Sequence, residues 1–80
     1  MDIAKQIKSL RKTKVYLKKA GYLPQGFQKK MMYAHLAKEL EGSCYVLIPY
    51  AKTDTGRKRL EDLGLEFQKL KIGFKLRAEK

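Results

Sequence analysis

The chain has 80 residues, an apolar share of 44% and a formal net charge of +11, from 19 lysines and arginines against eight aspartates and glutamates. This length predicts one domain over residues 1–80, near the lower limit for a fold held by a single core. The apolar share excludes a merely disordered basic tail, and the charge favours a polyanionic partner such as nucleic acid.

Cysteine use and apolar runs exclude several further classes. The single cysteine, Cys44, excludes an internal disulfide and is expected to be a small buried apolar residue. No cluster of cysteine and histidine indicates a metal site, and no motif indicates a cofactor. The longest apolar run, Cys44–Ile48, is too short to span a membrane. We therefore expect a soluble protein of the cytoplasm, with no metal, no cofactor and no membrane span.

A first helix is predicted to begin at Ile3, with Asp2 as its N-cap, and to end at Gly21. Lys14 and the β-favouring residues that follow Thr13 predict that this helix frays or breaks near Thr13. Its apolar residues recur at helical spacing and form one stripe: Ile3, Ile7, Leu10 and Leu17.

The region from Ile3 to Lys38 contains ten lysines and arginines and no acidic residue. Solvated helix faces normally mix the two signs, because like charges one turn apart destabilise a helix. We therefore expect this region to contact phosphates, and its lysine-rich character favours the nucleic-acid backbone over base edges. One side of the first helix carries Lys5, Lys8, Lys12 and Lys19, and a flank carries Arg11 and Lys18.

A second helix is predicted from Gln25–Gly26 through about Leu40, closed by Gly42, and it is apolar on most sides. We expect it to pack between the first helix and a sheet. Its cations Lys29 and Lys30 join the predicted phosphate-binding set.

Strands are predicted in the second half of the chain. Cys44–Ile48 is rich in β-formers and indicates a central strand that Pro49 ends. A third helix is expected over Thr55–Leu63, with Thr53–Thr55 supplying cap residues and Gly64 as its stop. After it, the apolar alternation changes phase near Gln68–Lys69, which predicts two strands or one bulged strand.

A second contact zone is predicted from the remaining cations. Arginines in the first turn of the third helix favour contact with phosphate or with guanine edges, although Glu61 offers Arg57 a structural partner instead. The terminal strand is expected to carry its own basic row. The zone comprises Arg57, Lys58, Arg59, Lys71, Lys75 and Arg77.

Three aromatic or titratable residues allow further roles. Tyr22 and Tyr50 lie at element ends beside basic residues and are the candidates for base stacking, although a tyrosine is more often a core-edge residue. His35, the single histidine, is expected to pack on an apolar helix. A catalytic role would need an acid–base partner within reach.

The predicted fold is a small α+β domain in the order α-α-β-α-β(β), with helices on a mainly antiparallel sheet of two or three strands. A winged-helix variant is the alternative. The predicted function is non-catalytic nucleic-acid binding, with DNA slightly favoured over RNA. The alternatives are a module that docks on an acidic protein, a small RNA-cleaving toxin that uses His35, and a basic helix lying on an anionic membrane. The open edge of the terminal strand offers one route to a dimer.

Overall fold

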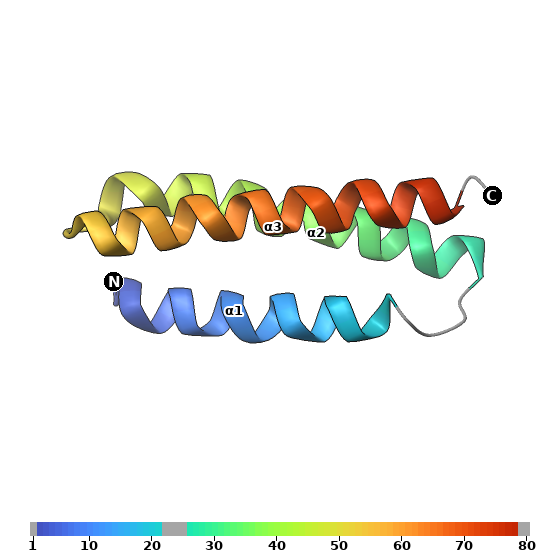
Figure 1. Ribbon diagram of the computed structural model, residues 1–80, viewed down its shortest axis with the longest axis horizontal. Helices are drawn as coiled ribbons and strands as arrows, with labels where there is room; N and C mark the ends of the chain where they lie inside the picture. Colours follow the sequence, from blue (N-terminus) through green and yellow to red (C-terminus); the bar gives the residue numbers. More distant parts are fainter. Residues whose placement is uncertain (1, 22–25, 79–80) are drawn as a thin grey trace.

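The computed structural model describes residues 2–21 and 26–78. Within them lie three α-helices, α1 (Ile3–Ala20), α2 (Phe27–Leu47) and α3 (Asp54–Ala78), and the 3-10 turn η1 (Ile48–Tyr50). α1 and α3 run in the same direction and α2 runs against both (Figure 1). The result is an elongated three-helix bundle with extents of 42 × 17 × 16 Å.

The predicted α+β fold is wrong, because residues 2–21 and 26–78 contain no strand. The sheet, the winged-helix variant and the open strand edge expected to support a dimer are therefore absent from this part of the chain. Both segments predicted as strands lie in helices instead.

α1 begins and ends where its sequence predicts, but it does not break near Thr13. The Asp2 carboxylate accepts a hydrogen bond from the backbone N–H of Lys5 at 3.2 Å, and the backbone N–H of Gly21 bonds back to the carbonyl of Leu17. At the predicted break, the Thr13 hydroxyl donates to the carbonyl of Ser9 within the helix. The helix therefore continues unbroken past Lys14.

α2 continues beyond the predicted stop at Gly42 and includes most of the predicted central strand. Cys44 follows Ala34 and Ala37 at helical spacing, and all three are buried. This inward-facing stripe favours the helix over the β propensity of the neighbouring residues. Pro49 falls in η1, where the first turn of a helix accepts proline.

α3 replaces the short third helix and the terminal strands. Thr53 caps it, because its hydroxyl accepts the backbone N–H of Gly56 at 3.0 Å. The change in apolar alternation near Gln68–Lys69, which predicted a bulge, instead reflects helical spacing. In a helix, successive buried residues are three or four positions apart. These are Leu60, Leu63, Phe67, Leu70 (partly buried) and Phe74.

Gly64 does not end α3 but lets another helix approach it closely. A Cβ on Gly64 would lie 2.9 Å from the ring of Tyr45 on α2. Glycine here therefore serves packing between α2 and α3.

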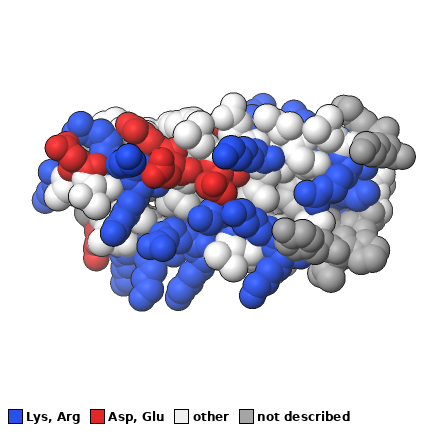
Figure 2. All heavy atoms as spheres, in the orientation of Figure 1, with Lys and Arg blue, Asp and Glu red and all other residues white. Residues whose placement is uncertain are grey.

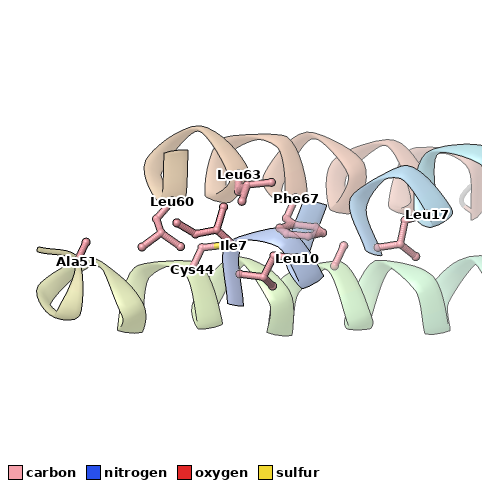
Figure 3. Close-up of a cluster of buried hydrophobic side chains, with 9 residues drawn as sticks. Ile7, Leu10, Leu17, Cys44, Ala51, Leu60, Leu63 and Phe67 are labelled. Carbon is pink, nitrogen blue, oxygen red and sulfur yellow. The ribbon is translucent and has the colours of Figure 1, made fainter. Parts of the chain in front are cut away.

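One apolar core joins the three helices (Figure 3). α1 contributes Ile7, Leu10 and Leu17, and packs mainly against α3. The prediction that Cys44 is buried is confirmed, and burial, with the charge of Glu41, raises the pKa of its thiol to about 11. None of the described helices combines the length and apolar character needed to cross a membrane.

Candidate nucleic-acid interface

The most distinctive surface of the molecule is the side of α1 that points away from the core. We call Lys5, Lys8, Lys12 and Lys19 the lysine face. All four are exposed, on the opposite side of the helix from the buried Ile7, Leu10 and Leu17. In Figure 2 the edge of the molecule formed by α1 is predominantly blue.

The lysine face has no counter-charge in the part of the chain that the structure describes. Among residues 2–21 and 26–78, none of its four side chains forms an ion pair or a side-chain hydrogen bond. Asp2 bonds to the backbone of Lys5 and leaves the ammonium group unpaired. The face therefore presents an array of positive charge about 21 Å long between Lys5 and Lys19.

The inner flank of α1 is different, because α3 supplies acidic neighbours there. Lys18 Nζ lies 3.1 Å from Glu66 Oε2. The hydrogen bond from Lys18 lowers the pKa of Glu66 against a smaller effect of partial burial, and the charges of Lys14 and Lys69 add to the lowering. Lys18 is thus paired, although the sequence places it in the phosphate-binding set.

Arg11 and Arg59 connect α1 with the start of α3. Both line an open groove between the two helices, together with Lys14 and Asp62. Arg59 also borders the first turn of α1, beside Ile3. Neither guanidinium makes an ion pair among the described residues. Arg59 is therefore placed to extend the α1 surface at this end of the bundle.

The other predicted cations at the start of α3 have separate positions. Arg57 lies 3.8 Å from Asp54, one turn earlier, and not beside Glu61 as the sequence allowed. Lys58 is exposed and has no ion-pair partner in the described part of the chain. The three basic residues 57–59 therefore have different surroundings in the structure.

At the other end of the bundle, most of the predicted cations hold the helices together. Lys71 pairs with Glu41 at 3.1 Å, with only 20% and 13% of the two side chains exposed. Arg77 donates to the carbonyl of Gly21 at 2.6 Å and lies over the ring of Phe74. Lys30 donates to the carbonyl of Arg77 at 3.3 Å.

Lys29 and Lys75 are exposed and have no ion-pair partner within the described ranges. The basic row predicted on a terminal strand does not exist, because this segment is helical: Lys71 and Lys75 lie one turn apart on one side of α3, and Arg77 lies on another side.

The structure describes only one of the two tyrosines predicted to stack on bases. Tyr50 is exposed in η1, at the end of the bundle where α1 and α3 begin. Tyr22 lies outside the described residues. Tyr16 and Tyr33 link α1 to α2 instead, and the hydrogen bond with Tyr16 raises the pKa of Tyr33.

His35 lies on the exposed side of α2, where its Nε2 is 3.3 Å from Glu39 Oε1. Glu39 lies one helical turn after His35 and therefore gives it a carboxylate partner. The pair is a surface contact within one helix. Within residues 2–21 and 26–78, no three or more histidine, cysteine, aspartate or glutamate side chains are grouped so that they could hold a metal ion.

Sequence reasoning missed the acidic side chains that neutralise the flank of α1. Glu66 and Asp62 belong to α3, and stopping that helix at Gly64 placed Glu66 in a strand. The spacing of the buried residues beyond Gly64 was the signal that could have found them. The chain matches no protein-family model, no curated protein and no solved structure.

Proposed function

We propose that this chain is a non-catalytic nucleic-acid-binding protein that contacts the phosphate backbone through the lysine face of α1. The observation that carries the proposal is that Lys5, Lys8, Lys12 and Lys19 are unpaired among the described residues, on a chain with a net charge of +11. Like charges one turn apart oppose helix formation, whereas a polyphosphate would make the same charges favourable.

The chemistry of the face favours backbone contact over base reading. Lysine is a point charge, whereas arginine offers the planar fork that reads guanine edges. Duplex DNA is the preferred ligand, because its major groove admits an α-helix whereas that of duplex RNA is deep and narrow. Arg11 and Arg59 supply further cations beside the face.

The proposal requires no reaction at His35, whose contact with Glu39 is exposed on α2. A cytoplasmic location is part of the same proposal, since the buried Cys44 thiol suits a reducing compartment. Docking on an acidic protein remains the outcome to consider if nucleic acid fails to bind.

The test is a titration of labelled duplex DNA at several salt concentrations, repeated with single-stranded DNA and structured RNA. If the four lysines each neutralise one phosphate, log K should fall with log salt with a slope of roughly −3 to −4. Replacing Lys5, Lys8, Lys12 and Lys19 by glutamine should remove most of that slope.

A second variant with the same change in charge is the matched control. It replaces Lys29, Lys52, Lys58 and Lys75, which are exposed and unpaired in the described part of α2, α3 and the turn between them, by glutamine. The control should keep most of the affinity. Equal weakening by both variants would mean that total charge alone drives binding, and weak binding that ignores salt would exclude the proposal.

A further inference from the structure

The side of α2 that faces away from the core is unusually apolar. It carries two pairs of large, partly exposed apolar neighbours, Met31 with Met32 and Tyr45 with Val46, and the Tyr45 ring also packs at its edge against Gly64 of α3. Met32 is 57% exposed and Val46 is 66% exposed. A surface helix normally presents polar residues on its outer side, so large exposed apolar side chains near both ends of this side indicate a partner there.

The charge of this outer side distinguishes it from the rest of the molecule. Its charged residues are the neighbours Lys38 and Glu39, which cancel, and His35 lies against Glu39. A polyanion or an acidic protein would be drawn to the lysine face instead. An apolar surface without net charge favours a partner surface that is also apolar and uncharged. The same side of α2 in a second copy of the chain is such a surface.

The residues of this side are also arranged symmetrically along α2. Lys38 and Glu39 lie at the centre of the pattern. Met31 and Val46 are equally far from that centre on opposite sides, as are Met32 and Tyr45. The members of these pairs, and of the pair His35 and Gly42, recur every three or four residues and so form one stripe on the helix.

We propose that two copies of this chain dimerise through the outer side of α2, with the two helices antiparallel about a two-fold axis near Lys38 and Glu39. Met31 then faces Val46 of the partner subunit, and Met32 faces Tyr45 of the partner subunit. At the centre, Lys38 faces Glu39 of the partner subunit, so the charges near the axis attract one another.

Gly42 supports this arrangement independently. Glycine inside a helix is unfavourable by comparison with alanine. A Cβ on Gly42 would meet no atom within 4 Å, so packing within one copy does not require glycine there. In the proposed dimer Gly42 leaves space for His35 of the partner subunit.

The available area agrees with a reversible dimer. With Phe27, one turn before Met31, the exposed apolar side chains come to roughly 500 Å² per copy, or on the order of 1,000 Å² for two copies. This is near the lower limit for a specific interface. The lysine face lies on α1 and would stay exposed. If the proposed function holds, the dimer would therefore present two phosphate-binding surfaces.

Disulfide trapping tests the register. His35→Cys with Gly42→Cys should give a covalent dimer under oxidising conditions. The two cysteines cannot pair within one chain, because two helical turns separate them by about 10.5 Å, beyond the reach of a disulfide. Cys44 would not compete, since it is fully buried.

Each single cysteine variant should remain largely monomeric, because the register places residue 35 beside residue 42 of the partner subunit and not beside a second cysteine. The matched control is Leu65→Cys with Ile72→Cys, an exposed pair at the same spacing on α3. Cross-linking of the α3 pair in place of the α2 pair would overturn the proposal.

Sedimentation equilibrium tests the dimer without cross-linking. We expect a monomer–dimer equilibrium that tightens as salt is added, because two chains of charge +11 repel one another until they are screened. Nucleic-acid binding should have the opposite dependence on salt. Met32→Lys with Val46→Lys should give a monomer with unchanged helix content, whereas Ile72→Lys with Leu76→Lys should still dimerise.

Two results would overturn the dimer. The first is a monomer at all salt concentrations up to about 1 mM protein, the weak end of measurable affinities. The second is an association that is lost only in the α3 variant. If Met32→Lys with Val46→Lys unfolds, disulfide trapping of His35→Cys with Gly42→Cys tests the dimer instead. Replacing the four lysines of the lysine face should leave dimerisation intact, which separates this proposal from the proposed function.

Discussion

Phe67 and Leu65 are two residues apart on α3, yet Phe67 is fully buried and Leu65 is 51% exposed. In a strand the two side chains would share a face, whereas in a helix they point about 200° apart. We expect Phe67→Ala to lower the free energy of unfolding by roughly 3–5 kcal/mol. Leu65→Ala should change it by about 0.5 kcal/mol or less.

Urea unfolding followed by circular dichroism measures both variants. Equal losses would contradict the helical assignment of this segment. If Phe67→Ala does not fold, Phe67→Leu should give the same ranking at a smaller cost.

Glu66 predicts a specific sensitivity to acid. Its hydrogen bond with Lys18 holds the pKa of the carboxyl below its ordinary value. Ionised Glu66 therefore stabilises the fold above the unfolded-state pKa of about 4.3, and this contribution is lost as the pH falls through the lower folded-state pKa. Between about pH 5 and pH 3, the stability of Glu66→Gln should decline less steeply than that of the wild type.

Glu61→Gln is the control for this effect, because Glu61 is exposed on the same helix and makes no ion pair among the described residues. Its acid profile should follow that of the wild type. Identical profiles for both variants would mean that the contact between Lys18 and Glu66 contributes nothing in solution.

At the scale of one helix, the lysine face should reduce the stability of the free protein. Lys5 with Lys8 and Lys8 with Lys12 are like charges one turn apart, and each such pair is unfavourable by about 0.2–0.5 kcal/mol. Replacing the four lysines by glutamine should raise the free energy of unfolding at low salt by roughly 0.5–1 kcal/mol. The gain should disappear at about 1 M salt, where the repulsion is screened.

Lys18→Gln is the matched control on the same helix. It removes one positive charge from α1 but also the partner of Glu66. Its stability at low salt should not increase. A gain equal to that of a lysine-face substitution would show that the local pairing is immaterial.

The elements differ in how well their sequence predicts them. α1 was predictable because its cap, stripe and end are all local signals, and the lysine face was predictable because it belongs to that one helix. Cys44–Ile48 was not, since a short apolar run fits a strand and a buried helix equally well. The choice between strand and helix depends on whether Cys44–Ile48 packs against a sheet or against other helices. That depends on residues far away in the sequence.

The contacts that join distant parts of the chain were unpredictable for the same reason. Lys18 reaches Glu66, and Arg77 reaches Gly21, only because α3 continues past Gly64. The phosphate-binding set predicted from the sequence therefore includes cations that contact other parts of the bundle, such as Lys18 and Arg77. Those at the end of α3 are mostly engaged in holding the bundle together.

Across the whole molecule, positive charge and helix–helix contacts are distributed unequally among the three helices. α2 and α3 pack against each other along their length, whereas α1 has fewer contacts and rests mainly on α3. α1 also carries seven of the 19 cations and no acidic residue. The acidic residues near it lie on the first half of α3, above the blue edge in Figure 2.

This asymmetry predicts which helix opens first. Local opening requires the least free energy where buried contacts are fewest and repulsion is greatest. In the free protein, the α1 amides around Ile7, Leu10 and Leu17 should exchange with solvent faster than those of α3 around Leu60 and Phe67. Hydrogen exchange followed by NMR or mass spectrometry measures this difference.

Duplex DNA should then slow exchange mostly in α1. Binding to the lysine face replaces no contact inside the bundle and removes the repulsion that favours opening of α1, so the added protection should extend to the buried side of that helix. The variant with glutamine at positions 5, 8, 12 and 19 should show no such protection. Protection that appeared in α2 while α1 was unchanged would place the nucleic acid on a different surface.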